Sequence, residues 1–189
     1  MKPYQIMGAP GLVLLAALAW QDERPGTYVG TALAQTPADH PASFTGSLLD
    51  RPPSLPLSAP QPVYVPAYSS IRLGSGKGKV DLATTLSIHN TSEKMALVIL
   101  RADYFDTSGS LIRSYAPDPL VVRPLGTVEA FVPVEDTRGG SGANFIVEWA
   151  GEGPTTEPLI EAVMIGSSGT QGYSFVSRGK AANVLQPAR

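Results

Sequence analysis

The sequence contains no cysteine among its 189 residues, and this absence excludes several kinds of fold and site. Without thiols the chain cannot form a disulfide-stabilised scaffold, a thiolate metal centre or a cysteine nucleophile. A cysteine-linked lipid anchor is not expected for the same reason. A domain of this chain must therefore be held together by the packing of a hydrophobic core.

The chain also has little charge. Only 16% of its residues are charged, and 14 basic against 16 acidic side chains give a formal net charge of −2. We expect no basic surface for nucleic acid and no polybasic segment for an anionic membrane. Glycine (19) and proline (18) together make up about a fifth of the chain, which favours many short strands over a helical bundle.

The N-terminal residues 1–34 are typical of a signal peptide. Lys2 is the only charge near the start, and the apolar run at 11–20 is about half the roughly 20 residues that a membrane span requires. Small-residue cleavage sites end at Ala19 and at Ala34, and an uncleaved anchor or a buried helix remains an alternative. We therefore expect an exported protein, periplasmic or extracellular, with no stable membrane span in the mature chain.

Residues 35–62 contain seven prolines and few large apolar side chains. Proline removes backbone donors and fixes φ, so this composition predicts a disordered, extended linker. A ligand for a proline-recognition domain is the alternative. At the other end of the chain, residues 181–189 are expected to form a flexible tail.

From residue 63 the pattern changes to short runs of alternating apolar and polar residues divided by turn formers. In the clearest run, at 80–89, every second residue is apolar or threonine. Residues 63–180 are therefore predicted to form an all-β, immunoglobulin-like antiparallel β-sandwich of about seven to nine strands, with a small barrel as the second choice. The expected strands are 63–71, 80–89, 95–105, 110–115, 119–123, 126–134, 143–150, 159–166 and 173–177.

Two glycine-rich segments supply the candidate contact surface. If strands 143–150 and 159–166 form an antiparallel pair, the loops at 138–144 and 166–172 meet at one end of the sandwich. Their polar side chains could then bind an unknown envelope protein or a small polar ligand. The alternative is that the glycines only permit tight turns. The candidate binding residues are Arg138, Ser141, Asn144, Ser168 and Gln171.

Recognisable catalytic and metal-binding patterns are weak. His89 is the only histidine of the predicted domain, and its place at a strand end indicates a solvent-facing residue rather than a general base. Asp103, Asp106 and the pair at 135–136 do not have the spacing of a calcium loop. We expect no catalytic residue, no metal and no cofactor. A calcium-dependent ligand-binding domain or a hydrolase that uses the same loop end remains the alternative.

Asn90-Thr91-Ser92 matches an N-glycosylation acceptor, a short and common motif. It matters only if the host glycosylates exported proteins.

Several segments together resemble a known family. They are VYVPAYS at 63–69, LSIHNT at 86–91, DYFDTSG at 103–109, GGSGANFIVEW at 139–149, and EAVMIG at 161–166 followed by SFVSRG at 174–179. In this order they resemble a bacterial family catalogued as a domain of unknown function, number 3124 in that series. The resemblance covers roughly residues 63–180 and implies an exported or envelope protein. It brings no activity, ligand or catalytic residue. The expected function is that of a non-catalytic binding or structural module.

Overall fold

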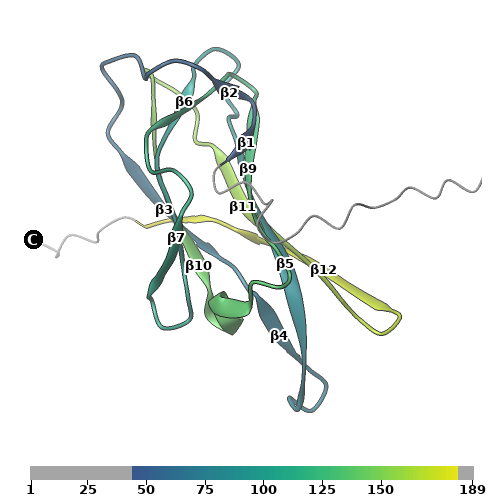
Figure 1. The fold of residues 1–189 in the computed structure, drawn as a ribbon. Coiled ribbons are helices and arrows are strands. Elements are labelled where there is room, and N and C mark those ends of the chain that lie inside the picture. The colour runs from purple at the N-terminus through teal and green to yellow at the C-terminus, as the bar shows by residue number, and fades with distance from the viewer. Residues whose placement is uncertain (1–43, 183–189) are drawn as a thin grey trace, which may run out of the picture. The chain divides into compact units, whose positions relative to one another are not determined.

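The computed structural model of the protein describes residues 44–182 (Figure 1). The predicted signal peptide, the first part of the predicted linker and most of the predicted tail lie outside these residues. The described chain is almost entirely β-structure, arranged as two antiparallel sheets that pack face to face. The predicted all-β sandwich is confirmed.

The first sheet has the strand order β1-β9-β5-β11-β12, with β4 paired to one end of β5. The second has the order β13-β3-β10-β6-β8-β2, with β7 paired to β6. Their bounds are β1 Thr45–Gly46, β2 Leu48–Leu49, β3 Gln61–Pro66, β4 Ser70–Leu73, β5 Gly78–His89, β6 Leu97–Phe105, β7 Leu111–Ser114, β8 Leu120–Val122, β9 Thr127–Val132, β10 Asn144–Gly151, β11 Leu159–Ser168, β12 Gln171–Arg178 and β13 Lys180–Ala181.

The core lies between the two sheets and follows the alternation of the sequence. Along β5, Leu82, Leu86 and Ile88 are fully buried, while the residues between them on the opposite face are half-buried. The second sheet contributes large side chains to the same core, among them Tyr104 and Phe145, whose ring centroids are 4.7 Å apart. The predicted buried and outward faces of β5 are therefore confirmed.

The predicted pairing of strands 143–150 and 159–166 is wrong. β10 pairs with β3 and β6 in the second sheet, whereas β11 pairs with β5 and β12 in the first. The connection at 152–158 crosses from one sheet to the other instead of closing a hairpin. Gly153 adopts a positive φ of 113° there, and Pro154 and Pro158 provide no backbone donor for a ladder.

The predicted first strand, 63–71, is also divided between the sheets. β3 ends at Pro66 in the second sheet, and β4 begins at Ser70 in the first. The crossing is buried, because Ala67 and Ser69 have no exposed surface. Backbone hydrogen bonds from Ala67 N to Ala143 O (2.8 Å) and from Leu82 N to Ser69 O (2.9 Å) hold it to both sheets.

Residues 44–58, which we call the strap, pack against the sandwich and differ from the predicted free linker. The ring of Phe44 is buried edge-on against Tyr115. β1 pairs with β9 in the first sheet, and β2 pairs with β8 in the second. At the end of β1, Gly46 has a φ of 121°, and a Cβ there would lie 2.4 Å from the carbonyl oxygen of Thr127, so the change of sheet requires glycine.

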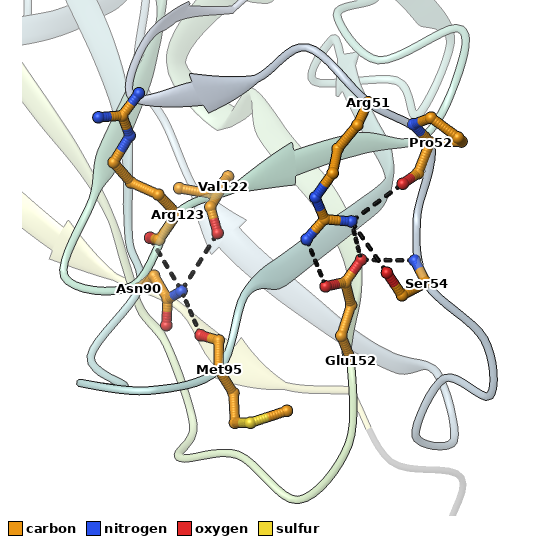
Figure 2. A network of polar contacts seen from close by, with 8 residues as sticks. All are labelled: Arg51, Pro52, Ser54, Asn90, Met95, Val122, Arg123 and Glu152. Carbon is orange, nitrogen blue, oxygen red and sulfur yellow. Dashed lines mark hydrogen bonds and ion pairs between the residues drawn. The ribbon is translucent and has the colours of Figure 1, made fainter.

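The strap is fixed by an ion pair with the β10–β11 connection (Figure 2). Arg51 donates from Nη1 and Nη2 to the two carboxylate oxygens of Glu152, at 2.7 and 2.6 Å, and Ser54 N donates to Oε1 at 2.6 Å. Ser58 adds a backbone bond to Gly151 O (2.9 Å). The seven prolines of residues 35–62 predicted an extended spacer. The buried ring of Phe44 and these polar contacts are nevertheless enough to hold the strap against the sandwich.

No helix within residues 44–182 is long and apolar enough to cross a membrane.

We predict that the Arg51–Glu152 ion pair makes stability depend on pH. The hydrogen bond from Arg51 holds the pKa of Glu152 below its ordinary value of 4.5. Because the pKa of Glu152 is lowered in the folded state, the ion pair stabilises the fold above pH 4.5. This stabilisation is lost as the pH falls below that value. Thermal unfolding should be measured at pH values above and below 4.5. We expect the wild-type protein to unfold at a higher temperature than Glu152→Gln above this pH, and the difference to shrink on acidification. Glu157→Gln, in the same connection, is the matched control. A difference between wild type and Glu152→Gln that stays constant with pH would contradict the prediction.

Candidate functional site

The two predicted contact loops occupy separate parts of the fold. Residues 138–144 form most of the short 3-10 turn η2 (Thr137–Gly142) and lead into β10 of the second sheet. Residues 166–172 form the tip of the hairpin between β11 and β12 of the first sheet. The turn η2 packs beside β4, whereas the hairpin tip extends away from the body of the sandwich (Figure 1). The two segments therefore do not form one rim.

Arg138, the charged member of the predicted set, is engaged within its own turn. Its Nε and Nη2 donate to the two carboxylate oxygens of Asp136, at 2.8 and 2.7 Å. This bond holds the pKa of Asp136 below its usual range. Asp136 Oδ1 also caps the turn by accepting from Arg138 N. The guanidinium thus closes the turn instead of standing free for a ligand.

The glycines of this turn are explained by close packing, of Gly139 on the buried Tyr104 and of Gly140 and Gly142 on Thr107. A Cβ at Gly139 would lie 2.0 Å from the hydroxyl oxygen of Tyr104. That hydroxyl is buried and shares a 2.7 Å hydrogen bond with Ser69 Oγ, and burial raises the pKa of Tyr104. Thr107 Oγ1 donates to Gly139 O at 2.9 Å and accepts from the amide of Gly142 at 3.0 Å. These contacts favour the tight-turn interpretation for 138–144.

The other candidate binding residues lie either near η2 or in the β11–β12 hairpin. Ser141 is exposed on η2, and Asn144 is half-buried at the start of β10, where its backbone pairs with both β3 and β6. Ser168 and Gln171 are exposed and face each other at the tip of the hairpin. Gln171 Oε1 accepts from the hydroxyl of Tyr173 at 3.1 Å. A binding role for these side chains stays a prediction.

The sequence predicted the two strands of the β11–β12 hairpin but not its place at the edge of the first sheet. Its turn consists of two residues, with Gly169 at a φ of 61°, as the first position of a type II′ turn requires. On the inner side, Phe175 packs edge-on against Tyr68, with ring centroids 5.7 Å apart. On the outer side, Ile165 and Val176 are 59% and 52% exposed. The hairpin thus presents apolar side chains to solvent.

The glycosylation motif has a structural role. Asn90 is only 3% exposed, and its Nδ2 lies within hydrogen-bond distance of the carbonyl oxygens of Met95 (2.9 Å), Val122 (3.3 Å) and Arg123 (3.0 Å) (Figure 2). Its Oδ1 accepts from the amide of Ser92. The side chain therefore joins the β5–β6 connection to the end of β8, and in the folded protein its amide nitrogen is not available for a glycan.

His89 lies at the end of β5, on the outer face of the first sheet, and contacts two hydroxyl groups. Its Nε2 is 2.9 Å from Ser87 Oγ, and its Nδ1 is 2.9 Å from Thr127 Oγ1. A serine and a histidine at this distance can exchange a proton. The group that orients the ring is a threonine hydroxyl rather than the carboxylate of a catalytic triad.

The acidic residues that could hold a cation are separated and have other partners. Within the described part of the chain, no three histidine or acidic side chains gather closely enough to hold a metal ion. Asp103 accepts from Arg101 Nε at 2.5 Å, and Asp106 Oδ1 accepts from the amides of Ser108 and Ser110, both at 2.8 Å. These contacts assign both carboxylates to ion pairing and turn formation.

We predict that Gly139→Ala destabilises the protein by about 1–3 kcal/mol, because the added methyl must displace the buried Tyr104 hydroxyl. Gly172→Ala is the matched control, since a Cβ at that position meets nothing within 4 Å. Denaturant unfolding of the two variants measures the difference. Equal stabilities would show that η2 does not depend on close packing.

Comparisons with known proteins place the chain in a family. No curated protein matches it. A solved structure titled "Crystal Structure of Thermotoga maritima 1070" is similar at 8% sequence identity and a TM-score of 0.38, covering 64% of this chain and 92% of that chain, a likeness too weak to support an argument. A family model described as "Protein of unknown function (DUF3124)" matches residues 60–182, from the start of β3 to the end of the described chain. The resemblance expected from the sequence is confirmed, and the chain belongs to the DUF3124 family.

Proposed function

We propose that this protein is an exported, non-catalytic binding module of the cell envelope, and that the outer edge of β12 receives an extended strand from a partner protein. The observation that carries the proposal is the unequal length of the sheet edges. The other three end strands of the described sheets, β1, β2 and β13, have two residues each, and the strands β4 and β7, which also have a single neighbour, have four each, whereas β12 has eight. Short edge strands prevent association, and a long one offers a template for pairing.

The sequence of β12 has few of the usual means of protecting an edge, and its one charged residue, Arg178, stands at its end. Gln171–Arg178 contains no proline and no lysine, and its register with β11 has no bulge. In a two-residue hairpin the closing pair is hydrogen-bonded, so the amides that alternate from Gly172 to Arg178 point away from β11. Four backbone donors are thus directed at the open edge, in the spacing that an added strand requires.

Side chains beside this edge support strand addition. Val176 lies directly across from Val163 on the outer face of the sheet, and Ile165 follows two residues along β11. An added strand would place its own side chains next to Val176. Each cross-strand apolar pair contributes about 0.2–1 kcal/mol. Of the predicted contact residues, Ser168 and Gln171 belong to this hairpin, while Arg138, Ser141 and Asn144 do not.

We predict that a photoreactive residue placed at Val176 in the native host forms a crosslink to a partner protein, whereas one at Ser141 does not. Ser174→Pro should abolish the crosslink, because proline removes an outward donor without affecting the pairs with β11. Ser174→Thr, which keeps the donor, should retain it. Thermal unfolding checks that both variants are folded. Crosslinking that survives Ser174→Pro, or that is equal at Ser141, would contradict strand addition at β12.

Export is tested separately. Fractionation should recover the protein outside the cytoplasm, and N-terminal sequencing should find a mature chain that begins after Ala19 or Ala34. A cytoplasmic protein that begins at Met1 would contradict this part of the proposal while leaving the β12 experiment valid.

A further inference from the structure

A cavity of about 320 Å³ opens beside the end of β10. Its wall is formed by β3, β10 and β13 of the second sheet and by the β10–β11 connection, through the residues Gln61, Val63, Trp149, Thr155, Glu157 and Ala181. This volume lies at the lower end of the range of small-molecule sites in proteins. The cavity uses no residue of the β11–β12 hairpin, so it is independent of the proposed function.

Two residues that line this cavity, Trp149 and Thr155, each carry a buried polar atom without a hydrogen-bond partner among the described residues. Trp149 is 7% exposed, and its Nε1 is withdrawn from solvent without a hydrogen-bond partner among the described residues. The same is true of Oγ1 of Thr155. Nearly all buried polar groups in proteins are hydrogen-bonded, so two unpartnered groups at one cavity indicate a molecule that supplies their partners.

The chemistry of the wall selects the ligand. An indole N–H only donates, so the ligand must present an acceptor to Trp149. The carboxylate of Glu157 only accepts and disfavours an anion, while the amide of Gln61 both donates and accepts. Val63, Ala181 and the indole ring provide an apolar surface. We propose that this cavity binds a small uncharged molecule in which a hydrogen-bond acceptor and a donor stand beside an apolar methyl group, as in the acetamide of an N-acetylated sugar.

Entry of the ligand involves the β10–β11 connection. Thr155 stands on this connection, between the exposed residues Pro154 and Thr156, and not on a strand. Because Nε1 and Oγ1 are shielded from solvent, a ligand in the cavity reaches them only if the connection shifts outward. The backbone amide NMR signals of Gly153 and Thr155 therefore report on binding in addition to the indole N–H signal of Trp149.

Nitrogen–proton NMR spectra of the full chain test the proposal. The chain has two tryptophans, and Trp20→Phe leaves the indole Nε1–H signal of Trp149 alone. N-acetylglucosamine is the probe, and glucose, which has no amide, is its control. We expect a saturable shift of the Trp149 indole signal and of the Gly153 and Thr155 amides with N-acetylglucosamine, and no saturable shift with glucose.

Variants locate the binding. Thr155→Val, which keeps the shape of the side chain, should weaken binding about two- to tenfold, as expected for the loss of one hydrogen bond. Gln61→Met should weaken it likewise. Thr156→Val is the matched control, because the hydroxyl of Thr156 bonds to Thr91 Oγ1 at 2.7 Å and does not line this cavity. No shift of the Trp149 signal, a shift that Thr155→Val leaves unchanged, or a long-lived water bound at the indole in place of the probe would overturn the proposal.

Discussion

The ion pair between Arg51 and Glu152, together with the buried ring of Phe44, holds the strap, a segment that spans both sheets and closes one side of the sandwich. Two stacked sheets have open edges wherever their end strands lack a neighbour. The strap places β1 on the first sheet and β2 on the second within five residues, so both edges at that side end in short strands. Because Glu152 belongs to the β10–β11 connection, the same contact also positions the chain that passes between the sheets.

Closure on the opposite side is only partial. After β12 the chain crosses at Gly179, where a Cβ would lie 2.6 Å from a side-chain carbon of Val63, and it continues as β13 on the second sheet. This crossing covers the base of the β11–β12 hairpin, and within residues 44–182 no other strand pairs with the outer edge of β12. The open edge is thus a consequence of where the chain changes sheets. The cavity at Trp149 lies next to the same crossing, since Ala181 forms part of its wall.

The sequence predicted the faces of the strands well and their neighbours poorly. Alternation along 80–89 indicates which side chains are buried, because that depends only on the pleat of one strand. Which strand lies beside another depends on where the chain crosses between sheets. No alternation pattern records that Pro66 ends β3 or that 152–158 is a crossing and not a hairpin. The proline count likewise concealed the strap, which a single buried ring, Phe44, and an ion pair 101 residues apart hold in place.

The candidate site shows the same limit. The glycines at 138–144 indicate turn formers or a binding rim, and only the fold shows that Gly139 lies directly on Tyr104. The edge position of β12 and the cavity at Trp149 both arise from contacts between distant segments, so no local motif could indicate them. Asn90 is the converse case, since a local motif suggested a surface role for a side chain that the fold buries.

The measurement that tests the role of the strap most directly is thermal unfolding of two shortened chains, one beginning at residue 44 and one at residue 60. If the strap closes the sandwich, the longer chain should unfold at a temperature about 10 °C or more above the shorter one, because the shorter one loses the buried Phe44 and the Arg51–Glu152 contact. Equal unfolding temperatures would show that residues 44–59 are a linker and that the sandwich is closed without them.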